Sequence, residues 1–225
     1  MKLRPELEDE NTRYLSGGAP PHPFRVILPP RESLPIIRTT RLCLRPLTRD
    51  DAQAIFDAKS RETPQTWLMM KSKPWTSIDE TYAWIDRKVF EKPASAAGRS
   101  FQYVVVLGHD PRGAIVGSIG MNQVHPVPNI GYATDEGYRG MGYASEALGG
   151  FMDAWWGLAR REDEEGEKEE RSEDWDGTER VFATVNKNNV ASLKILARNG
   201  FRVYFERTMA DGETVCCAAA EKPEK

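Results

Sequence analysis

Cysteine and histidine are scarce in this chain of 225 residues, and their scarcity argues against two kinds of site. The cysteines are odd in number and two of them are adjacent, which does not suit a framework of disulfides, so we expect a reducing compartment. No cysteine or histidine stands at a spacing that suits zinc, so no metal is expected. The residues concerned are Cys43, Cys216, Cys217, His22, His109 and His125.

Long apolar runs are also lacking. No stretch of the sequence stays apolar over the roughly 20 residues that a helix needs to span a bilayer. Residues 1–6 have none of the features of a secretory signal peptide. We therefore expect no membrane partner and a location in the cytoplasm, with or without the nucleus.

A net excess of basic residues is missing as well, because the formal net charge is −3. The charge is unevenly distributed: the segment from Glu162 to Asp176 has a local charge of −8, which leaves about +5 on the remainder. A mildly basic body favours an anionic ligand. No basic stripe with interleaved aromatic residues is present, so a nucleic-acid partner is not expected.

The acidic run is predicted to be an insertion at about residues 161–178. One interpretation, which we favour, is a solvated and disordered insertion, since a dense run of like charges buries little apolar surface. The other interpretation is an acidic lip that attracts a cationic substrate.

Proline marks the first part of the chain. Residues 1–35 contain seven prolines, and Gly17 and Gly18 interrupt them. We interpret this segment as an arm that wraps around the domain or stays mobile, with residues 24–28 as its one packed piece. The length of the chain suits a single domain, which we place at residues 36–220, with a short tail at 221–225.

The rest of the chain alternates between strand-like and helix-like patterns. Thr48 and Ser77 are predicted helix starts, and Glu80 completes a capping box with Ser77. The second of these helices carries an apolar stripe of Ile78, Tyr82, Ile85 and Val89. Strands are predicted at residues 41–47, 101–107, 115–121, 129–134, 180–185, 202–209 and 214–220, with hairpins at 101–121 and 202–220. The predicted fold class is α+β, a mixed, mostly antiparallel sheet with helices on both faces.

The most informative stretch is the glycine-rich run at residues 138–148. It follows the strand-like segment 129–134 and opens an amphipathic helix that we expect to continue to about Arg160. The first amides of a helix are unpaired and the helix dipole is positive at that end, so the run can cradle an anion, and we favour a pyrophosphate. Gly140 and Gly142 matter because a Cβ would keep phosphate oxygens away and restrict the turn.

Other phosphate-binding loops fit this run less well. A P-loop is excluded because no Gly-Lys-Ser/Thr follows the glycines. The dinucleotide fingerprint lacks its third glycine, since Ser145 stands in that place. A turn that only caps the helix and binds no ligand remains the alternative.

A second segment, residues 188–201, reads as a capped helix followed by Gly-Phe. Asn188 is a favourable N-cap, and Gly200 stands where a left-handed glycine ends a helix. A buried strand is predicted just before it, at residues 180–185. The helix, expected at residues 189–199, has a predicted buried stripe of Val190, Leu193, Leu196 and Ala197.

Together the two segments resemble the two cofactor elements of the GNAT N-acetyltransferase superfamily. Arg139-x-x-Gly142-x-Ala144 is similar to its pyrophosphate loop, and Asn189-x-x-Ser192 before Gly-Phe is similar to its second element. The lead-in at residues 40–47, Thr-Arg-Leu-Cys-Leu-Arg-Pro-Leu, is typical of the branch that includes ribosomal-protein and other protein N-terminal acetyltransferases. The resemblance covers about residues 36–220.

The resemblance implies a fold and a cofactor. The strands at 129–134 and 180–185, the fourth and fifth of the core, would run parallel and splay into a V, where the amide-rich arm of acetyl-CoA bonds to unpaired backbone groups. The implied contacts to the pantetheine arm are Ile130, Gly131, Tyr132, Asn189 and Ser192. The implied contacts to the pyrophosphate are the amides of Arg139, Gly140, Met141, Gly142, Tyr143 and Ala144.

The implied reaction is transfer of an acetyl group from the CoA thioester directly to an amine. A base must take a proton from the ammonium, and a donor should meet the departing thiolate. For the donor we favour Ser192, because the tyrosine that many relatives use is replaced here by Leu196; an ordinary helix serine is the alternative. No base is assigned: residues 127–131 lack the glutamate of many relatives, Asn129 cannot serve, and His125 or Tyr132 could act only through water.

The acceptor is not named by the sequence. By resemblance, the first two helices and their connector cover the acceptor side, where Trp67 and Trp75 are candidate substrate contacts. The amine could belong to a protein N-terminus or to a small molecule, and the expected assembly is a monomer or homodimer. The alternative function is a non-catalytic acyl-CoA-binding or interaction module, which the missing strand glutamate, the missing tyrosine and the acidic segment motivate.

Overall fold

The computed structural model describes residues 1–3, 16–61, 73–165, 168 and 172–224. The chain divides into two compact units. The first unit comprises Met1–Ile27, Met121–Gly131 and Leu158–Lys225, and the second unit comprises Leu28–Gly120 and Tyr132–Gly157. The candidate substrate contact Trp67 lies outside the described residues.

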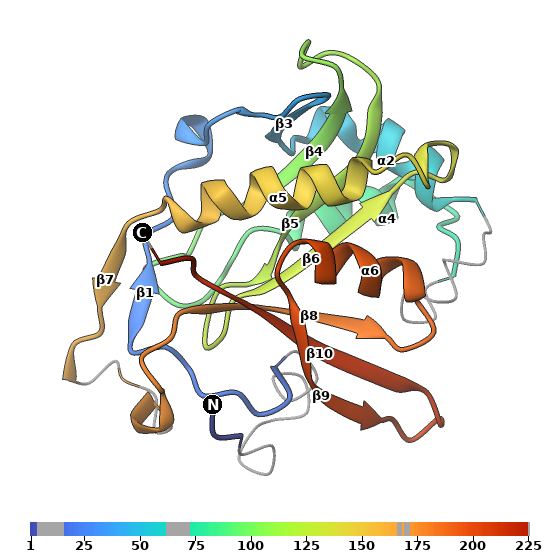
Figure 1. The fold of residues 1–225 in the computed structure, drawn as a ribbon. Coiled ribbons are helices and arrows are strands. Elements are labelled where there is room, and N and C mark those ends of the chain that lie inside the picture. Colours follow the sequence, from blue (N-terminus) through green and yellow to red (C-terminus); the bar gives the residue numbers. More distant parts are fainter. Residues whose placement is uncertain (4–15, 62–72, 166–167, 169–171, 225) are drawn as a thin grey trace. The chain divides into compact units, whose positions relative to one another are not determined.

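The second unit contains four neighbouring antiparallel strands (Figure 1). In sheet order they are β2 (Ile37–Arg38), β3 (Leu42–Pro46), β4 (Gln102–Leu107) and β5 (Ile115–Gln123), of which β5 continues past this unit. The register pairs Leu44 with Val105 and Val104 with Ser118. The predicted strand at 41–47 and the predicted hairpin at 101–121 are confirmed.

Helices cover both faces of these strands. Successive side chains of a strand point to opposite faces of the sheet, so each face offers apolar side chains to a helix. The helices are α2 (Ala52–Lys59), α4 (Ile78–Asp86) and α5 (Tyr143–Trp156). Val104 and Val106 of β4 cluster with Ile55 of α2 and Ile85 of α4. Tyr103, which directly precedes Val104 and so points to the opposite face of β4, instead packs edge-on against Phe151 of α5, with ring centroids 5.9 Å apart. None of the helices in the described ranges is long and apolar enough to cross a membrane.

Side-chain caps start the first two helices as predicted. Thr48 and Asp51 form a capping box that opens a short 3-10 helix, Arg49–Asp51, ahead of α2. Ser77 accepts from the Asp79 amide and Glu80 reaches back to complete the second box. The predicted stripe of α4 is too long, however: the helix ends at Asp86, and Val89 beyond it is 40% exposed.

The helix α5 is shorter than the sequence analysis predicts. It ends at Trp156, with Gly157 at its C-cap, and does not continue to Arg160. Arg160 instead opens strand β7 (Arg160–Glu162), which pairs antiparallel with β1 (Phe24–Val26). The prediction was wrong because the partner strand lies far away in the sequence, so the helical pattern alone could not show that residue 160 is extended.

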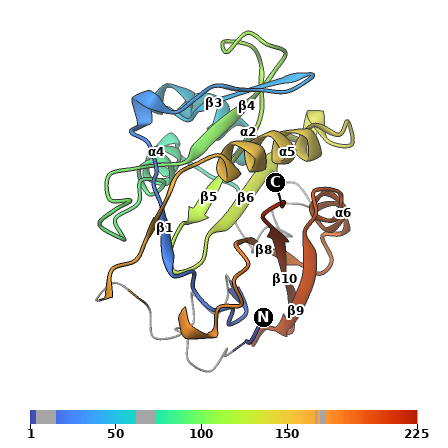
Figure 2. The same cartoon turned by 60° about the vertical axis from the view of Figure 1, so that its left-hand side comes forward.

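The first unit contains the parallel strand pair and the C-terminal hairpin. Strand β8 (Arg180–Asn186) pairs antiparallel with β10 (Thr214–Glu221), which in turn pairs with β9 (Arg202–Thr208), as Figure 2 shows. On its other side, β8 runs parallel to β6 (Asn129–Thr134) over only two residue pairs, Asn129 with Phe182 and Ile130 with Ala183. So brief a parallel ladder is what strands that splay apart produce. The predicted α+β class, a mixed and mostly antiparallel sheet, is confirmed.

The helix α6 (Val190–Arg198) of the first unit differs from its prediction in two details. Its N-cap is Asn189 and not Asn188, because the Asn189 side chain accepts from the Ser192 amide at 3.1 Å. Its buried face is carried by Leu196, which is 2% exposed, whereas Val190 is 55% exposed and Ala197 is also exposed. Val190 and Ala197 are seven residues apart and therefore share one face, which here lies on the outside.

The N-terminal arm packs over more of its length than predicted. Residues 24–28 include strand β1, but residues 16–22 are buried as well. The Tyr204 hydroxyl donates to the Ser16 carbonyl oxygen. A Cβ on Gly17 would lie 2.6 Å from the Phe205 ring, so only glycine fits between the arm and β9 at this point.

Part of the acidic segment is packed, which corrects the favoured interpretation of a solvated and disordered insertion, although Glu164, Glu165 and Glu173 are exposed. Asp163, directly after β7, is buried and forms an ion pair with Arg25 of β1 at 2.6 Å. Asp174 pairs with Lys2 at 3.0 Å, and the ring of Trp175 packs against Phe24. Asp163 and Asp174 therefore neutralise cations on the arm.

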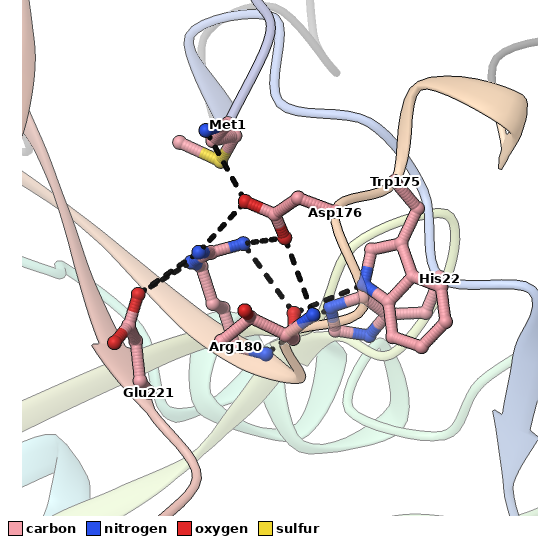
Figure 3. A network of polar contacts seen from close by, with 7 residues as sticks. Met1, His22, Trp175, Asp176, Arg180 and Glu221 are labelled. Atoms are coloured by element: carbon pink, nitrogen blue, oxygen red, sulfur yellow. Dashed lines mark hydrogen bonds and ion pairs between the residues drawn. The ribbon is translucent and has the colours of Figure 1, made fainter.

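A polar network joins the arm, the end of the acidic segment and strands β8 and β10 (Figure 3). The guanidinium of Arg180 lies between Asp176, at 2.7 Å, and Glu221, at 2.9 Å. Hydrogen bonds from Arg180 hold the pKa of Asp176 well below its usual range, despite partial burial. His22 stacks on Phe24 and its Nε2 accepts from the Arg180 amide at 3.2 Å.

We expect the stability of the protein to fall as the pH drops from about 6.5 to 4, in part because of His22. Burial lowers the pKa of His22 from 6.5 to about 4, with the nearby Glu179 carboxylate partly opposing the effect. The unfolded chain then takes up a proton in this window that the folded chain refuses, a loss of about 3 kcal/mol at 1.36 kcal/mol per pKa unit. Urea unfolding between pH 7 and 4 should show a shallower decline for His22→Gln. Equal declines for both proteins would contradict a neutral, buried His22.

Candidate functional site

The glycine-rich run forms a left-handed turn at the start of α5, within the second unit. After β6 the chain makes a 3-10 turn at Glu136–Tyr138 and then enters the loop. Gly140 and Gly142 have φ angles of 76° and 83°. Residues with a Cβ adopt such angles only at a cost, so the two glycines are required by the backbone. Gly142 is the N-cap and supplies no side-chain cap, so the helix start is left open.

The open helix start presents a row of backbone donors. The first intrahelical bond runs from the Glu146 amide to the Gly142 carbonyl oxygen at 3.1 Å. The five amides of residues 140–144 have no acceptor among the described residues. Three residues of the loop, Gly140, Met141 and Gly142, are exposed. Consecutive free N–H groups at the positive end of a helix form an anion-binding site.

Arg139 contributes less than predicted to this row. Its amide already donates to the Glu136 carbonyl oxygen at 3.2 Å, so it is not free for a phosphate. Its side chain folds back along the loop, with Nε donating to the Thr134 carbonyl oxygen at 3.3 Å. Of the six amides that the resemblance assigns to the pyrophosphate, five are therefore available.

A carboxylate in the first turn of α5 ties the loop to the turn before β3. Glu146 accepts from the Thr39 hydroxyl at 2.6 Å and from the amide and Nε of Arg41, both at 2.7 Å. Arg41 also donates to the Met141 carbonyl oxygen at 3.0 Å and stacks over the ring of Tyr143. Sequence reasoning missed this cluster, and its one signal is an acidic residue where the helix dipole favours one.

The ionisation of Glu146 follows from these contacts. Partial burial alone would raise its pKa, but the bonds from Thr39 and Arg41 outweigh burial and lower it. The carboxylate is therefore charged at neutral pH and compensated by the Arg41 guanidinium. The negative charge of Glu146, one turn from the loop, is therefore neutralised by Arg41 and does not add to the charge at the loop.

A hollow lies beside the loop, within the same unit. It is lined by β5, β6 and the start of α5, and its empty space, open solvent included, amounts to about 230 Å³. Tyr132, Tyr143 and Ala144, three of the predicted cofactor contacts, line it together. Gly117 of β5 allows the strands to approach, since a Cβ there would lie 2.3 Å from the Ala133 carbonyl oxygen. The hollow thus continues from the free amides along β6.

The other predicted contacts on β6 belong to the first unit. Ile130 is 3% exposed and pairs with Ala183 of β8, so its side chain is not open to a ligand. A Cβ on Gly131 would lie 2.5 Å from Nδ2 of Asn122, which itself donates to Asn129. Asn129 is buried and donates to the Thr184 hydroxyl at 3.4 Å. These amides and hydroxyls hold the strands and offer no base.

Asn189 and Ser192 also lie in the first unit, at the start of α6. Oδ1 of Asn189 accepts one bond as the helix cap, which leaves the Nδ2 donors directed away from the cap for a ligand. Ser192 is partly buried, one turn into the helix. Asn189 and Ser192 thus place two polar side chains at the start of α6, and their roles in binding and catalysis stay predictions.

No residue of β6 carries a carboxylate or an imidazole. The acids that follow the strand are engaged: Asp135 pairs with Arg61 at 3.0 Å and Glu136 approaches Arg139 at 3.9 Å. The described residues near the loop therefore do not identify a base, and the base stays unassigned.

Trp75 lies beside the core under α2 and α4 of the second unit. It is half-buried, and its ring centroid is 6.1 Å from that of Trp84. The ammonium of Lys59 lies over the same ring at 5.1 Å. One indole face of Trp75 is thus taken by a cation, and a role for Trp75 in contacting an acceptor stays a prediction.

Comparison with known proteins places this geometry among acyl-transferring enzymes. Residues 41–202 match the family model of the acetyltransferase (GNAT) domain. No curated protein matches the sequence.

Several solved structures share the fold. An enzyme from Salmonella typhimurium that modifies the N-terminal serine of ribosomal protein L7/L12 is 20% identical, with a TM-score of 0.58 over 83% of this chain and 99% of that one. A chimera of spermidine N-acetyltransferase from Vibrio cholerae and hSSAT is 14% identical, with a TM-score of 0.57 over 81% of this chain and 96% of that one. A ribosomal L7/L12 α-N-protein acetyltransferase in complex with coenzyme A is 19% identical, with a TM-score of 0.55 over 83% and 98%.

Proposed function

This chain belongs to the acetyltransferase (GNAT) family, and we propose on that basis that it is an acetyl-CoA-dependent N-acetyltransferase. It moves the acetyl group from the CoA thioester directly to an amine. The observation that carries the proposal is the row of five free amides at residues 140–144. These donors stand in the loop that the family uses for the pyrophosphate of the cofactor.

The residues present fit the cofactor. The φ angles of Gly140 and Gly142 turn successive amides outward, and the missing side chains leave room for phosphate oxygens. The hollow lined by Tyr132, Tyr143 and Ala144 suits a narrow chain such as pantetheine. When bound, acetyl-CoA supplies the activated acyl group, and the protein supplies position, orientation and proton transfer.

Ser192 is the proposed donor to the departing thiolate. Its hydroxyl belongs to the first turn of α6, which Asn189 caps, so its backbone is fixed. A thiolate leaves more easily if a proton or hydrogen bond meets it. In this proposal the acceptor ammonium first passes one proton to water, because no side chain is assigned as its base, and the free amine then attacks the thioester. The second proton that the nitrogen loses as the amide forms replaces the one that Ser192 gives to the thiolate.

Replacing Ser192 with alanine is expected to lower kcat on the order of 100-fold, the lower end of what a positioned general acid contributes. The change removes only the hydroxyl, so the affinity for CoA and the melting temperature should stay close to the original values. The measurement is thioester cleavage followed by thiol release, with Kd determined separately by calorimetry. An unchanged kcat would leave Ser192 an ordinary helix serine.

The acceptor class is proposed from the relatives. Of the solved neighbours, one modifies a ribosomal protein N-terminus and another is a spermidine N-acetyltransferase. We therefore propose a protein N-terminus or a small-molecule amine for this chain. Turnover with an N-terminal peptide and with a polyamine, each at the same amine concentration, would separate the two.

The first test is calorimetry with acetyl-CoA and with free CoA, supported by a thermal shift. Binding at one site with micromolar affinity should raise the melting temperature, as linkage requires. If neither ligand binds, the loop only caps α5 and the catalytic proposal falls.

A non-catalytic acyl-CoA-binding module is the second candidate. The observation that favours it is the absence of a carboxylate or imidazole in β6. It requires that acetyl-CoA binds and that no amine is acetylated. Turnover with any amine, lost when Gly142 is altered, would exclude it.

A further inference from the structure

The guanidinium of Arg41 is held on three sides by the loop and the first turn of α5. Its Nε donates to Glu146, its Nη1 donates to the Met141 carbonyl oxygen, and its flat face lies 4.7 Å from the Tyr143 ring centroid. A planar group with this many partners has one orientation. Its position is therefore set before any ligand arrives.

The remaining nitrogen, Nη2, faces the glycine loop. It would lie 3.3 Å from a Cβ placed on Gly142, and it has no hydrogen-bond partner among the described residues. The Arg41 side chain is 47% exposed, so Nη2 is open to a ligand at the loop. Two N–H groups of a cation thus lie next to the five free amides.

We propose that Arg41 is a further cofactor-binding residue, which donates from Nη2 to a phosphate oxygen of acyl-CoA while its other nitrogens hold the loop. The inference rests on the proposed function, because it needs a phosphate at residues 140–144. Lysine could not replace it, since one ammonium cannot reach Glu146, Met141 and a phosphate in fixed directions. Arg41 also neutralises the charge of Glu146. Without Arg41, that carboxylate would repel the phosphate.

The chain offers a matched control in Arg49. Its guanidinium pairs with Asp86 at 2.6 Å, lies 4.7 Å from the Tyr82 ring centroid and is 57% exposed. Arg41 and Arg49 lie in the same unit and are similarly exposed, and each has an ion pair and a stacked tyrosine of its own. Only Arg41 contacts the loop.

The experiment is calorimetry of Arg41→Met, Arg49→Met and the double variant Arg41→Met with Glu146→Gln, over a range of salt concentrations. We expect Arg41→Met to bind CoA about 10- to 100-fold more weakly, the range for a lost hydrogen bond to a charged group. Its affinity should also depend less on salt, because one cation no longer meets the phosphate. Arg49→Met should behave like the unaltered protein.

The double variant distinguishes a direct contact between Arg41 and the phosphate from an effect that Arg41 exerts only by neutralising Glu146. If Arg41 binds the phosphate, the double variant stays weak although Glu146 no longer repels it. An affinity that returns to the original value, a loss in Arg41→Met with an unchanged salt dependence, or no loss at all would each overturn the inference. Failure of the unaltered protein to bind CoA would instead overturn the proposed function.

3′-Dephospho-CoA identifies the phosphate that Arg41 meets. If the partner is the 3′-phosphate, the unaltered protein and Arg41→Met bind this ligand equally well. If the partner is the pyrophosphate, Arg41→Met loses affinity for both ligands by a similar factor. Either pattern supports the contact.

Discussion

Replacing Gly142 with glutamate is expected to weaken acetyl-CoA binding more than 100-fold, on the order of 3 kcal/mol. The φ angle of 83° at this N-cap is costly for a residue with a Cβ, and the new Cβ would meet Nη2 of Arg41 at 3.3 Å. The new carboxylate would also stand where the amides bind an anion and would repel phosphate. Calorimetry with acetyl-CoA measures the loss directly.

Gly212→Glu is the matched control for this change. Gly212 lies in the turn between β9 and β10 with a φ angle of 84°, and a Cβ there meets nothing within 4 Å. Both variants should lose about 1–2 kcal/mol of folding free energy to backbone strain, measured by urea unfolding. Only Gly142→Glu should lose the cofactor. Intact binding by Gly142→Glu would remove the loop from the site.

The loop was predictable because its chemistry is local. Two glycines, a strand before them and an amphipathic helix after them are enough to specify an open helix start, and β6 was predicted with its observed bounds. Helix caps at Thr48 and Ser77 are local for the same reason, since a capping box spans only four residues.

The support of the loop was not predictable, because its parts are distant in the sequence. Arg41 and Glu146 are 105 residues apart, and nothing in either segment names the other. The early end of α5 has the same cause, since Arg160 is extended only because β1 pairs with it. Local patterns report what a segment can do alone, and long-range pairing decides between the options.

The buried face of α6 shows a further limit. Val190 and Leu196 are both apolar, and periodicity places them among the candidates for the core, but only Leu196 is buried. An apolar residue at the edge of a helical stripe loses little by exposure, so hydrophobicity alone does not determine which face packs. The base of the reaction has no local signal either, because β6 offers no ionisable candidate except Tyr132.

The packing of part of the acidic segment is the largest departure from the sequence analysis. A substitution at Asp163 measures how much this packing contributes to the free energy of unfolding. Its side chain is 0% exposed and pairs at 2.6 Å with Arg25, which is 8% exposed. Removing one partner of a buried ion pair leaves the other charge uncompensated, at a cost of about 3–5 kcal/mol. We therefore expect Asp163→Ala to lower the free energy of unfolding by about that amount, a large share of the roughly 5–15 kcal/mol typical of a folded protein.

The neighbouring residue provides the control. Glu164 forms an ion pair with Arg161 at 4.0 Å while its side chain is 85% exposed, so Glu164→Ala should cost less than about 1 kcal/mol. The double change Arg25→Met with Asp163→Leu removes both charges, and it should recover most of the stability that Asp163→Ala loses. Urea unfolding gives the three free energies, and amide exchange at Val26, which faces Arg160 across β1 and β7, reports whether the strand pair opens first. Equal values for Asp163→Ala and Glu164→Ala would mean that the buried pair contributes nothing and that the acidic segment is held by its other contacts.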